Sequence, residues 1–95
     1  MRAFRHVVLF RIHDTVPEDD VTAALDELRT LAALPGVVAW RVERSLDARK
    51  GRVIVEDATF ASADDFERFR IHPTHVAAGQ RMAAISDWWN GDYLE

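Results

Sequence analysis

The fold is decided by residues 37–60, VVAWRVERSLDARKGRVIVEDATF. Val37 to Leu46 and about Val53 to Phe60 are rich in β-branched and aromatic residues, while Asp47 to Arg52 between them is charged and contains Gly51. Two apolar runs around a glycine-containing turn predict a β-hairpin. The first strand of this hairpin has one apolar face, made of Val38, Trp40 and Val42.

A helix is predicted before the hairpin. Thr15 followed three residues later by Glu18 is a capping-box signature, and Pro17 suits the first turn because its missing N–H is not needed there. Apolar residues then recur at spacings of three and four up to Pro35-Gly36, which ends the helix. The sequence therefore predicts an amphipathic helix that covers one face of a sheet.

Helical segments are also predicted after the hairpin. Ser62 opens a helix that Pro73 interrupts. Thr74 can then cap a new helical segment to about Ala84. His72 precedes the proline and is therefore expected to be extended.

Strand-forming stretches flank these elements. Ala3 to Ile12 is β-branched and aromatic, and Ile85 to Leu94 supplies a last strand or strand-like segment. The element order is β-α-β-β-α-β, an α+β ferredoxin-like arrangement with a four-stranded antiparallel sheet. At 95 residues the chain has room for one domain, residues 1–95.

Both faces of the predicted sheet carry apolar side chains. Two helices cover only one face, yet Val7, Leu9, Val53 and Val55 make the other face apolar too. A second sheet would bury that surface, and twofold pairing into a dimeric α/β barrel is the simplest way to supply it. We therefore expect a homodimer, in preference to a monomer with one mixed, solvated sheet face.

Composition and charge argue against several classes of protein. The net charge of −4 is spread along the chain, so neither a nucleic-acid-binding surface nor a polybasic membrane anchor is expected. The chain has no cysteine, which excludes disulfides, thiolate metal sites and a cysteine nucleophile. Charges interrupt the N-terminal apolar run, so no signal peptide or membrane span is predicted, and the expected compartment is cytoplasmic.

Five stretches are characteristic in combination: RHVVLFRI at residues 5–12, the Leu34–Val37 corner, VIVEDATF at 53–60, FRIHPTHVAAG at 69–79 and the C-terminal DWWNGDY. The most specific piece is the HPxH motif at residues 72–75. Together they make the chain resemble the stress-responsive A/B-barrel (Dabb) family along nearly its whole length. This resemblance implies a dimeric barrel, as the pattern of apolar faces indicates independently.

Within this family the chain is similar to polyketide cyclases of the olivetolic acid cyclase type, which close a ring by an aldol-type reaction in a cavity between sheet and helices. In such an enzyme the second histidine of HPxH acts as base, a tyrosine six residues before it assists, and a histidine early in the first strand lines the cavity. His75 and His6 match the two histidines, whereas Phe69 occupies the tyrosine position. The resemblance implies His75 as base without the tyrosine hydroxyl.

Physical chemistry also favours His75 as a base. The residue lies in the first turn of a predicted helix, where free N–H groups disfavour the imidazolium, and a neutral ring accepts a proton. Removal of a proton from carbon between two carbonyls needs such a base and an oxyanion stabiliser. The alternative is that His75 bonds a backbone carbonyl and fixes the bend after Pro73.

His6 and Glu56 are polar residues at strand positions that should face the helices. A buried carboxylate needs a partner, and a bond from Glu56 to His6 or His75 would orient the imidazole. Glu56 could equally pair with Arg41 or Arg44 across the strands, and we favour this ordinary ion pair. The candidate catalytic residues are His75, His6 and Glu56.

A cavity beneath the helices would suit a small aromatic or polyketide-like ligand. Gly79 either leaves space there or lets helices pack closely, and we favour close packing. No metal site is expected, because Pro73 breaks the register that would aim His72 and His75 at one point. No cofactor is expected either. The predicted ligand-contacting residues are Val8, Phe10, Val38, Trp40, Phe69, His72, Val76, Gly79 and Trp88.

Three functions fit these features. The first is a polyketide cyclase-like lyase with His75 as general base. The second is a non-catalytic stress-response protein that binds a small apolar ligand in the same cavity. The third is a cofactor-independent monooxygenase-like barrel, in which a substrate activated by histidine reacts with oxygen. The fold alone does not decide among them.

Overall fold

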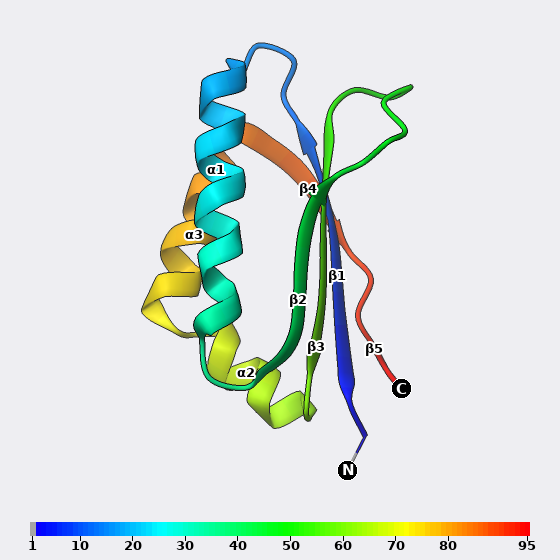
Figure 1. Ribbon diagram of the computed structural model, residues 1–95, viewed down its shortest axis with the longest axis vertical. Coiled ribbons are helices and arrows are strands. Elements are labelled where there is room, and N and C mark those ends of the chain that lie inside the picture. Colours follow the sequence, from blue (N-terminus) through cyan, green and yellow to red (C-terminus); the bar gives the residue numbers. More distant parts are fainter. Residues whose placement is uncertain (1) are drawn as a thin grey trace.

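The computed structural model describes residues 2–95 and contains an antiparallel five-stranded sheet with its helices on one side (Figure 1). The predicted α+β ferredoxin-like order is confirmed, and the last strand is split by Gly91 and Asp92, so the sheet has five strands instead of four. The elements are β1 (Phe4–Ile12), α1 (Glu18–Thr30), the 3₁₀ helix η1 (Leu31–Ala33), β2 (Val37–Arg44), β3 (Val53–Phe60), α2 (Ala63–Arg70), α3 (Pro73–Ile85), β4 (Ser86–Asn90) and β5 (Tyr93–Leu94).

Strand β1 lies in the middle of the sheet, between β3 and β4, and β5 pairs with the start of β1. The register of β1 against β3 places His6 opposite Ala58 and Val8 opposite Glu56. Side chains alternate along a strand, and the even-numbered residues of both strands point toward the helices. His6 and Glu56 therefore lie on neighbouring strands of the same helix-facing surface.

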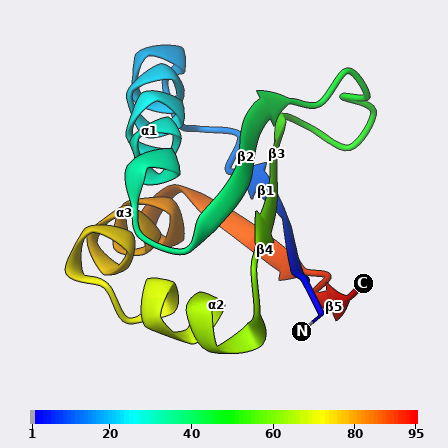
Figure 2. The same cartoon turned by 60° about the horizontal axis from the view of Figure 1, so that its bottom comes forward.

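Helices α1 and α3 cover this surface, and α2 lies at one end of it (Figures 1 and 2). The apolar side of α1 is buried against the sheet, as its periodicity predicts. Trp40 joins β2 to α1, because its Nε1–H donates to the carbonyl oxygen of Leu28 at 3.1 Å. Ser62 caps α2 as predicted, with its hydroxyl oxygen accepting the N–H of Asp65.

Helix α1 begins later than the capping-box pattern predicts. Its N-cap is Pro17 and no side chain caps it, so the predicted start at a Thr15–Glu18 box is wrong. The residue before a proline is disfavoured in the helical conformation, which keeps Val16 out of the helix. Three acidic residues in the first turn, Glu18 among them, favour the positive end of the helix dipole instead.

A short break between α2 and α3 determines where His75 lies. The cap of α3 is His72, not Thr74 as predicted: the backbone of His72 is extended, and its Nδ1 accepts the N–H of Thr74 at 3.1 Å. Pro73 follows at the start of the helix, where a missing N–H breaks no bond. The helix therefore begins two residues earlier than a Thr74 cap would allow, and His75 is its third residue.

Strand β2 contains a bulge that reorients one predicted ligand-contacting residue. Its register against β3 shifts between Val37 and Ala39, so Val38 is an extra residue on this strand. Val38 is 65% exposed, whereas Trp40 and Val42 pack against the core. The predicted common face of these three residues is therefore wrong for Val38.

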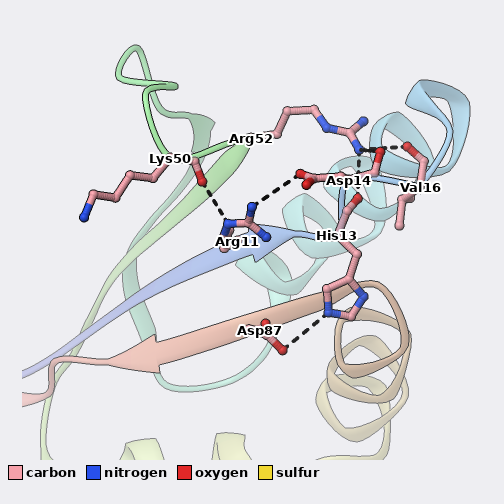
Figure 3. A network of polar contacts seen from close by, with 7 residues as sticks. All are labelled: Arg11, His13, Asp14, Val16, Lys50, Arg52 and Asp87. Carbon is pink, nitrogen blue, oxygen red and sulfur yellow. Dashed lines mark hydrogen bonds and ion pairs between the residues drawn. The ribbon is translucent and has the colours of Figure 1, made fainter.

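Two arginines tie the hairpin turn to the end of β1. The Arg52 guanidinium donates to the carbonyl oxygens of His13 at 2.9 Å and Val16 at 2.8 Å, and Arg11 donates to that of Lys50 at 2.8 Å (Figure 3). The two Arg52 bonds satisfy backbone acceptors in the connection between β1 and α1, and the Arg11 bond satisfies one in the hairpin turn. They fix the end of the sheet at which β1 leads into α1.

The opposite face of the sheet carries no helix in the part of the chain that the structure describes (Figure 2). Leu9 on β1 and Trp89 on β4 pair across the strands and are 44% and 61% exposed. Val53 and Val55 of β3 are partly exposed on the same face. An apolar second face therefore exists, as the sequence predicts.

The backbone at Gly36, between η1 and β2, should not tolerate a side chain. Its φ is +88°, and a Cβ there would lie 3.2 Å from the Cβ of Asp65. We expect Gly36→Ala to lower the free energy of unfolding in urea by about 1–2 kcal/mol. Gly91→Ala is the control, because a Cβ at Gly91 meets nothing within 4 Å. Equal losses in both variants would contradict this assignment.

Candidate functional site

A cavity of about 350 Å³ lies between the sheet and the helices. The sheet side is formed by His6, Val8, Phe10, Glu56, Trp88 and Asn90. On the helix side the lining residues are Leu28 of α1, Phe66 and Arg70 of α2, and His75, Val76, Gly79, Gln80, Met82 and Ala83 of α3. Most of the lining is apolar, so the few polar groups determine the chemistry of the site.

His6 is held between two carboxylates. Its Nε2 lies 3.0 Å from Oε2 of Glu56, and its Nδ1 lies 2.7 Å from Oδ1 of Asp92. Glu56 comes from β3, and Asp92 comes from the turn between β4 and β5. His6 is 5% and Glu56 2% exposed, so these two residues lie at the inner end of the cavity, whereas the side chain of Asp92 is partly exposed and lies outside the cavity lining.

The surroundings of His6 raise its pKa above the ordinary value of 6.5. Burial alone acts in the opposite direction, because desolvation disfavours the imidazolium. Hydrogen bonding to Glu56, its negative charge and the corresponding contributions of Asp92 together outweigh burial. The two carboxylates therefore stabilise the protonated form of the ring, which has one donor for each of them.

His75 lines the cavity from the first turn of α3. Its Nδ1 lies 2.8 Å from the carbonyl oxygen of Arg70. A carbonyl oxygen only accepts hydrogen bonds, so Nδ1 carries the proton, and in the neutral ring Nε2 keeps a free lone pair. The two alternatives from the sequence are thus compatible: His75 bonds a backbone carbonyl and also borders the cavity.

Phe69 supports the His75 ring by packing. The centroids of the two rings are 4.6 Å apart, and Phe69 also contacts Trp40 at a centroid distance of 5.5 Å. Phe69 is 1% exposed. It fixes the position of His75 from within the core and has no hydroxyl to offer a ligand.

The three candidate catalytic residues, His6, Glu56 and His75, line one cavity. Five of the predicted ligand-contacting residues line it as well: Val8, Phe10, Val76, Gly79 and Trp88.

Four predicted ligand-contacting residues lie outside the cavity lining. Val38 is exposed at the bulge of β2. Trp40 and Phe69 pack in the aromatic core behind His75. His72 uses its Nδ1 for the cap of α3. Backbone geometry therefore accounts for Val38 and His72, whereas Trp40 and Phe69 use their side chains for core packing.

The ordinary cross-strand ion pair that we favoured for Glu56 is wrong. Arg44 reaches α1 and pairs with Glu18 at 3.0 Å. Arg41 lies opposite Asp57, on the far face of the sheet from Glu56. The carboxylate of Glu56 is instead compensated by His6 on the neighbouring strand.

The close helix packing that we favoured for Gly79 is also wrong. A Cβ at this position would meet nothing within 4 Å, and Gly79 borders the cavity. A side chain at position 79 would therefore extend into open space beside the cavity.

Four polar residues of the site were missed in the sequence: Asp92, which contacts His6, and Arg70, Gln80 and Asn90, which line the cavity. Asp92 follows Gly91, whose N–H donates to the carbonyl oxygen of Val7 at 2.7 Å and so turns the chain back over β1. That glycine in a predicted strand was the available signal. Arg70 lines the cavity from the last turn of α2, and nothing in its sequence context distinguished it from Arg68.

Among residues 2–95, no group of three or more His, Cys, Asp or Glu side chains could hold a metal ion. His6 directs its two nitrogens to two separate carboxylates, so the three side chains do not converge on one point. Over the same residues, no helix combines the length and apolar character needed to cross a membrane.

A family model described as the stress responsive A/B barrel domain, Dabb, matches residues 4–93. The chain belongs to the Dabb family. The match runs from β1 to β5 and therefore includes every residue of the site described above. No curated protein matches this Dabb domain in sequence.

Solved structures share the fold of this Dabb domain. A dimeric ferredoxin-like protein of unknown function from Thermobifida fusca is 28% identical with a TM-score of 0.88, covering 99% of this chain and 92% of that one. Hydroxynitrile lyase from Passiflora edulis is 19% identical with a TM-score of 0.84, covering 98% and 93%. SnoaB, a cofactor-independent oxygenase from Streptomyces nogalater, is 22% identical with a TM-score of 0.77, covering 98% and 92%.

The His6 cluster should make the stability of this Dabb domain depend on pH. The His6 pKa is raised on folding, so the folded protein binds more protons than the unfolded chain at pH values between 6.5 and the folded pKa. The stabilisation from this group is therefore complete below pH 6.5 and is lost as the pH rises through the folded pKa. Urea denaturation across this pH range measures the decline.

Asp92→Asn should lower the His6 pKa, because it removes one of the two negative charges on the ring. NMR titration of the His6 imidazole signals measures this change. The matched control is Asp87→Asn, since Asp87 lies 3.4 Å from His13 and belongs to another pair. A His6 pKa that stays the same in Asp92→Asn would contradict the assigned role of Asp92.

Proposed function

We propose that this Dabb domain is a lyase- or cyclase-type enzyme in which His75 removes a proton from a carbon atom next to a carbonyl group. The observation that carries the proposal is the bond from Nδ1 of His75 to the carbonyl oxygen of Arg70, at 2.8 Å. It assigns the ring proton to Nδ1 and leaves Nε2 as the basic atom of a residue that lines the cavity.

The cavity suits a small, mainly apolar carbonyl compound. Its volume of about 350 Å³ falls in the range of about 300–1,000 Å³ that is typical of ligand pockets. Phe10 and Trp88 supply aromatic surface, which favours a flat aromatic or polyketide-like ligand. Proton removal creates an enolate oxygen, and the side-chain amides of Gln80 and Asn90 are hydrogen-bond donors in the same lining.

His6 and Glu56 have a positioning role in this proposal. Both nitrogens of His6 contact carboxylates, so the ring has no free nitrogen for a substrate. Its part is to hold Oε2 of Glu56, which leaves the other carboxylate oxygen to accept a hydrogen bond from a substrate hydroxyl. Phe69 has no hydroxyl, so a tyrosine-assisted aldol step is not part of the proposal.

Similar structures are named for different activities, so this fold supports more than one reaction. Hydroxynitrile lyase and the oxygenase SnoaB share the architecture and carry out different chemistry. Because the fold does not choose the reaction, the proposal rests on His75 and its surroundings. Ligand binding without catalysis and oxygenation are the competing outcomes of the experiment.

Hydrogen–deuterium exchange at carbon tests the proposed base. The probe is 1-phenylpropan-2-one, an apolar aryl ketone, dissolved in D₂O near neutral pD, with loss of its CH₂ signal followed by proton NMR. We expect the protein to accelerate exchange above the buffer rate. His75→Gln should lower the protein-catalysed rate by about 10²–10⁴-fold, the usual contribution of a general base.

His13→Gln is the matched control, because His13 lies at the end of β1, outside the cavity lining. Exchange at the wild-type rate in His75→Gln would refute the proposal. Saturable binding of the ketone without exchange would favour a non-catalytic binding protein. Oxygen uptake on addition of hydroxylated aromatic compounds, without exchange of the ketone, would favour an oxygenase.

We also propose that the chain forms a homodimer through the open face of the sheet. Leu9 and Trp89 are exposed there side by side. The Thermobifida fusca protein, 28% identical over nearly the whole chain, is described as dimeric. Two such faces would close into a barrel and remove their apolar surface from water. A cytoplasmic location stays a prediction from the sequence.

Light scattering coupled to size exclusion tests the dimer. We expect a mass about twice the 10.8 kDa of one chain, and a double variant, Leu9→Lys with Trp89→Lys, should reduce it to that of one chain. Ile71→Lys is the control, because Ile71 is 65% exposed but lies between α2 and α3. A wild-type mass of one chain would contradict the proposed pairing.

A further inference from the structure

Arg70 brings a positive charge to the open side of the cavity. Its side chain is 55% exposed, whereas those of His6 and Glu56 are 6% and 3% exposed. Among the described residues that line the cavity, Arg70 is the single arginine or lysine. The lining therefore has an inner end that carries the Glu56 carboxylate and a permanently cationic residue nearer to solvent.

The guanidinium of Arg70 has donors to spare. Its Nε and one terminal nitrogen both lie 3.1 Å from the same oxygen of Glu67, Oε2. A guanidinium has five N–H groups, so further donors remain for a ligand. The pair with Glu67 is exposed and contributes little to stability, and a ligand carboxylate that accepts two parallel hydrogen bonds can replace it.

The position of Arg70 also relates a bound anion to the proposed base. The backbone carbonyl of Arg70 holds Nδ1 of His75, so one residue carries both the anchor of the base and the cationic side chain. At the inner end of the cavity, Glu56 only accepts hydrogen bonds and both nitrogens of His6 already contact carboxylates, so this pair offers no free donor to an anion. A ligand with an anionic group would thus place that group at Arg70 and its apolar part inward.

We infer that Arg70 selects substrates that carry a carboxylate, binding this group at the mouth of the cavity while the apolar body and its carbonyl group lie beside His75. The inference rests on the proposed function for the reaction at carbon and adds the substrate class, small apolar keto acids. Arg70 is then a specificity-determining residue.

Calorimetric titration with 2-naphthoate and 2-naphthamide tests the inference, because the two probes share one ring system and differ in charge. We expect the wild-type protein to bind naphthoate about tenfold more tightly, as for a hydrogen bond to a charged group. Arg70→Gln should abolish this preference. Glu67→Gln should increase it, because it removes the competing carboxylate from the guanidinium.

Arg68→Gln is the matched control: Arg68 lies on the same helix, pairs with Asp65 and is outside the cavity lining, so the preference should persist. Equal affinities in the wild type, or a preference that survives Arg70→Gln, would overturn the inference. If ketone exchange depends on His75 but the protein does not prefer naphthoate, only the inference about Arg70 is overturned. A naphthoate preference without ketone exchange would overturn the proposed reaction alone.

Discussion

The burial of His6 imposes the charge balance on which the rest of the site depends. A buried imidazole needs a hydrogen-bond partner for each nitrogen, and the protein supplies Glu56 and Asp92. The contact with Glu56 requires the observed register of β1 against β3, because a slip of one residue would carry the carboxylate to the other face. The contact with Asp92 ties the C-terminal segment to the central strand. Three distant segments thus specify one polar cluster.

Backbone chemistry at the break between two helices orients the other imidazole. The last carbonyl groups of a helix have no partner within it, and His75 satisfies one of them at the end of α2. Pro73 makes this geometry accessible, because it stops α2 and starts α3 within three residues. Phe69 then packs against the ring. The tautomer of His75 therefore follows from the fold itself, without any carboxylate beside it.

Structural features that are set by local sequence patterns could be predicted. The hairpin, the order of the elements, the Ser62 cap and the break at Pro73 each depend on a few neighbouring residues and could be predicted. The bulge at Val38 could not, since an extra residue changes the facing of a strand without changing its composition. Nor could the partner of Glu56, because choosing between His6 and an arginine needs the register of three strands. Asp92 lies 86 residues from His6, and only the tertiary fold brings them together.

The open space beside Gly79 means that the size of the cavity can change without a change in the fold. Glycine within a helix lowers its stability by about 0.5–1 kcal/mol relative to alanine, so Gly79 makes α3 less stable than an alanine would. Because an added methyl group at this position would contact no side chain beyond its chain neighbours and no other element, a bulkier residue could occupy the open space without disturbing Ala78 or Met82 in the core. A substitution at this one position can therefore change which molecules fit the cavity, while the fold, His6 and His75 stay the same.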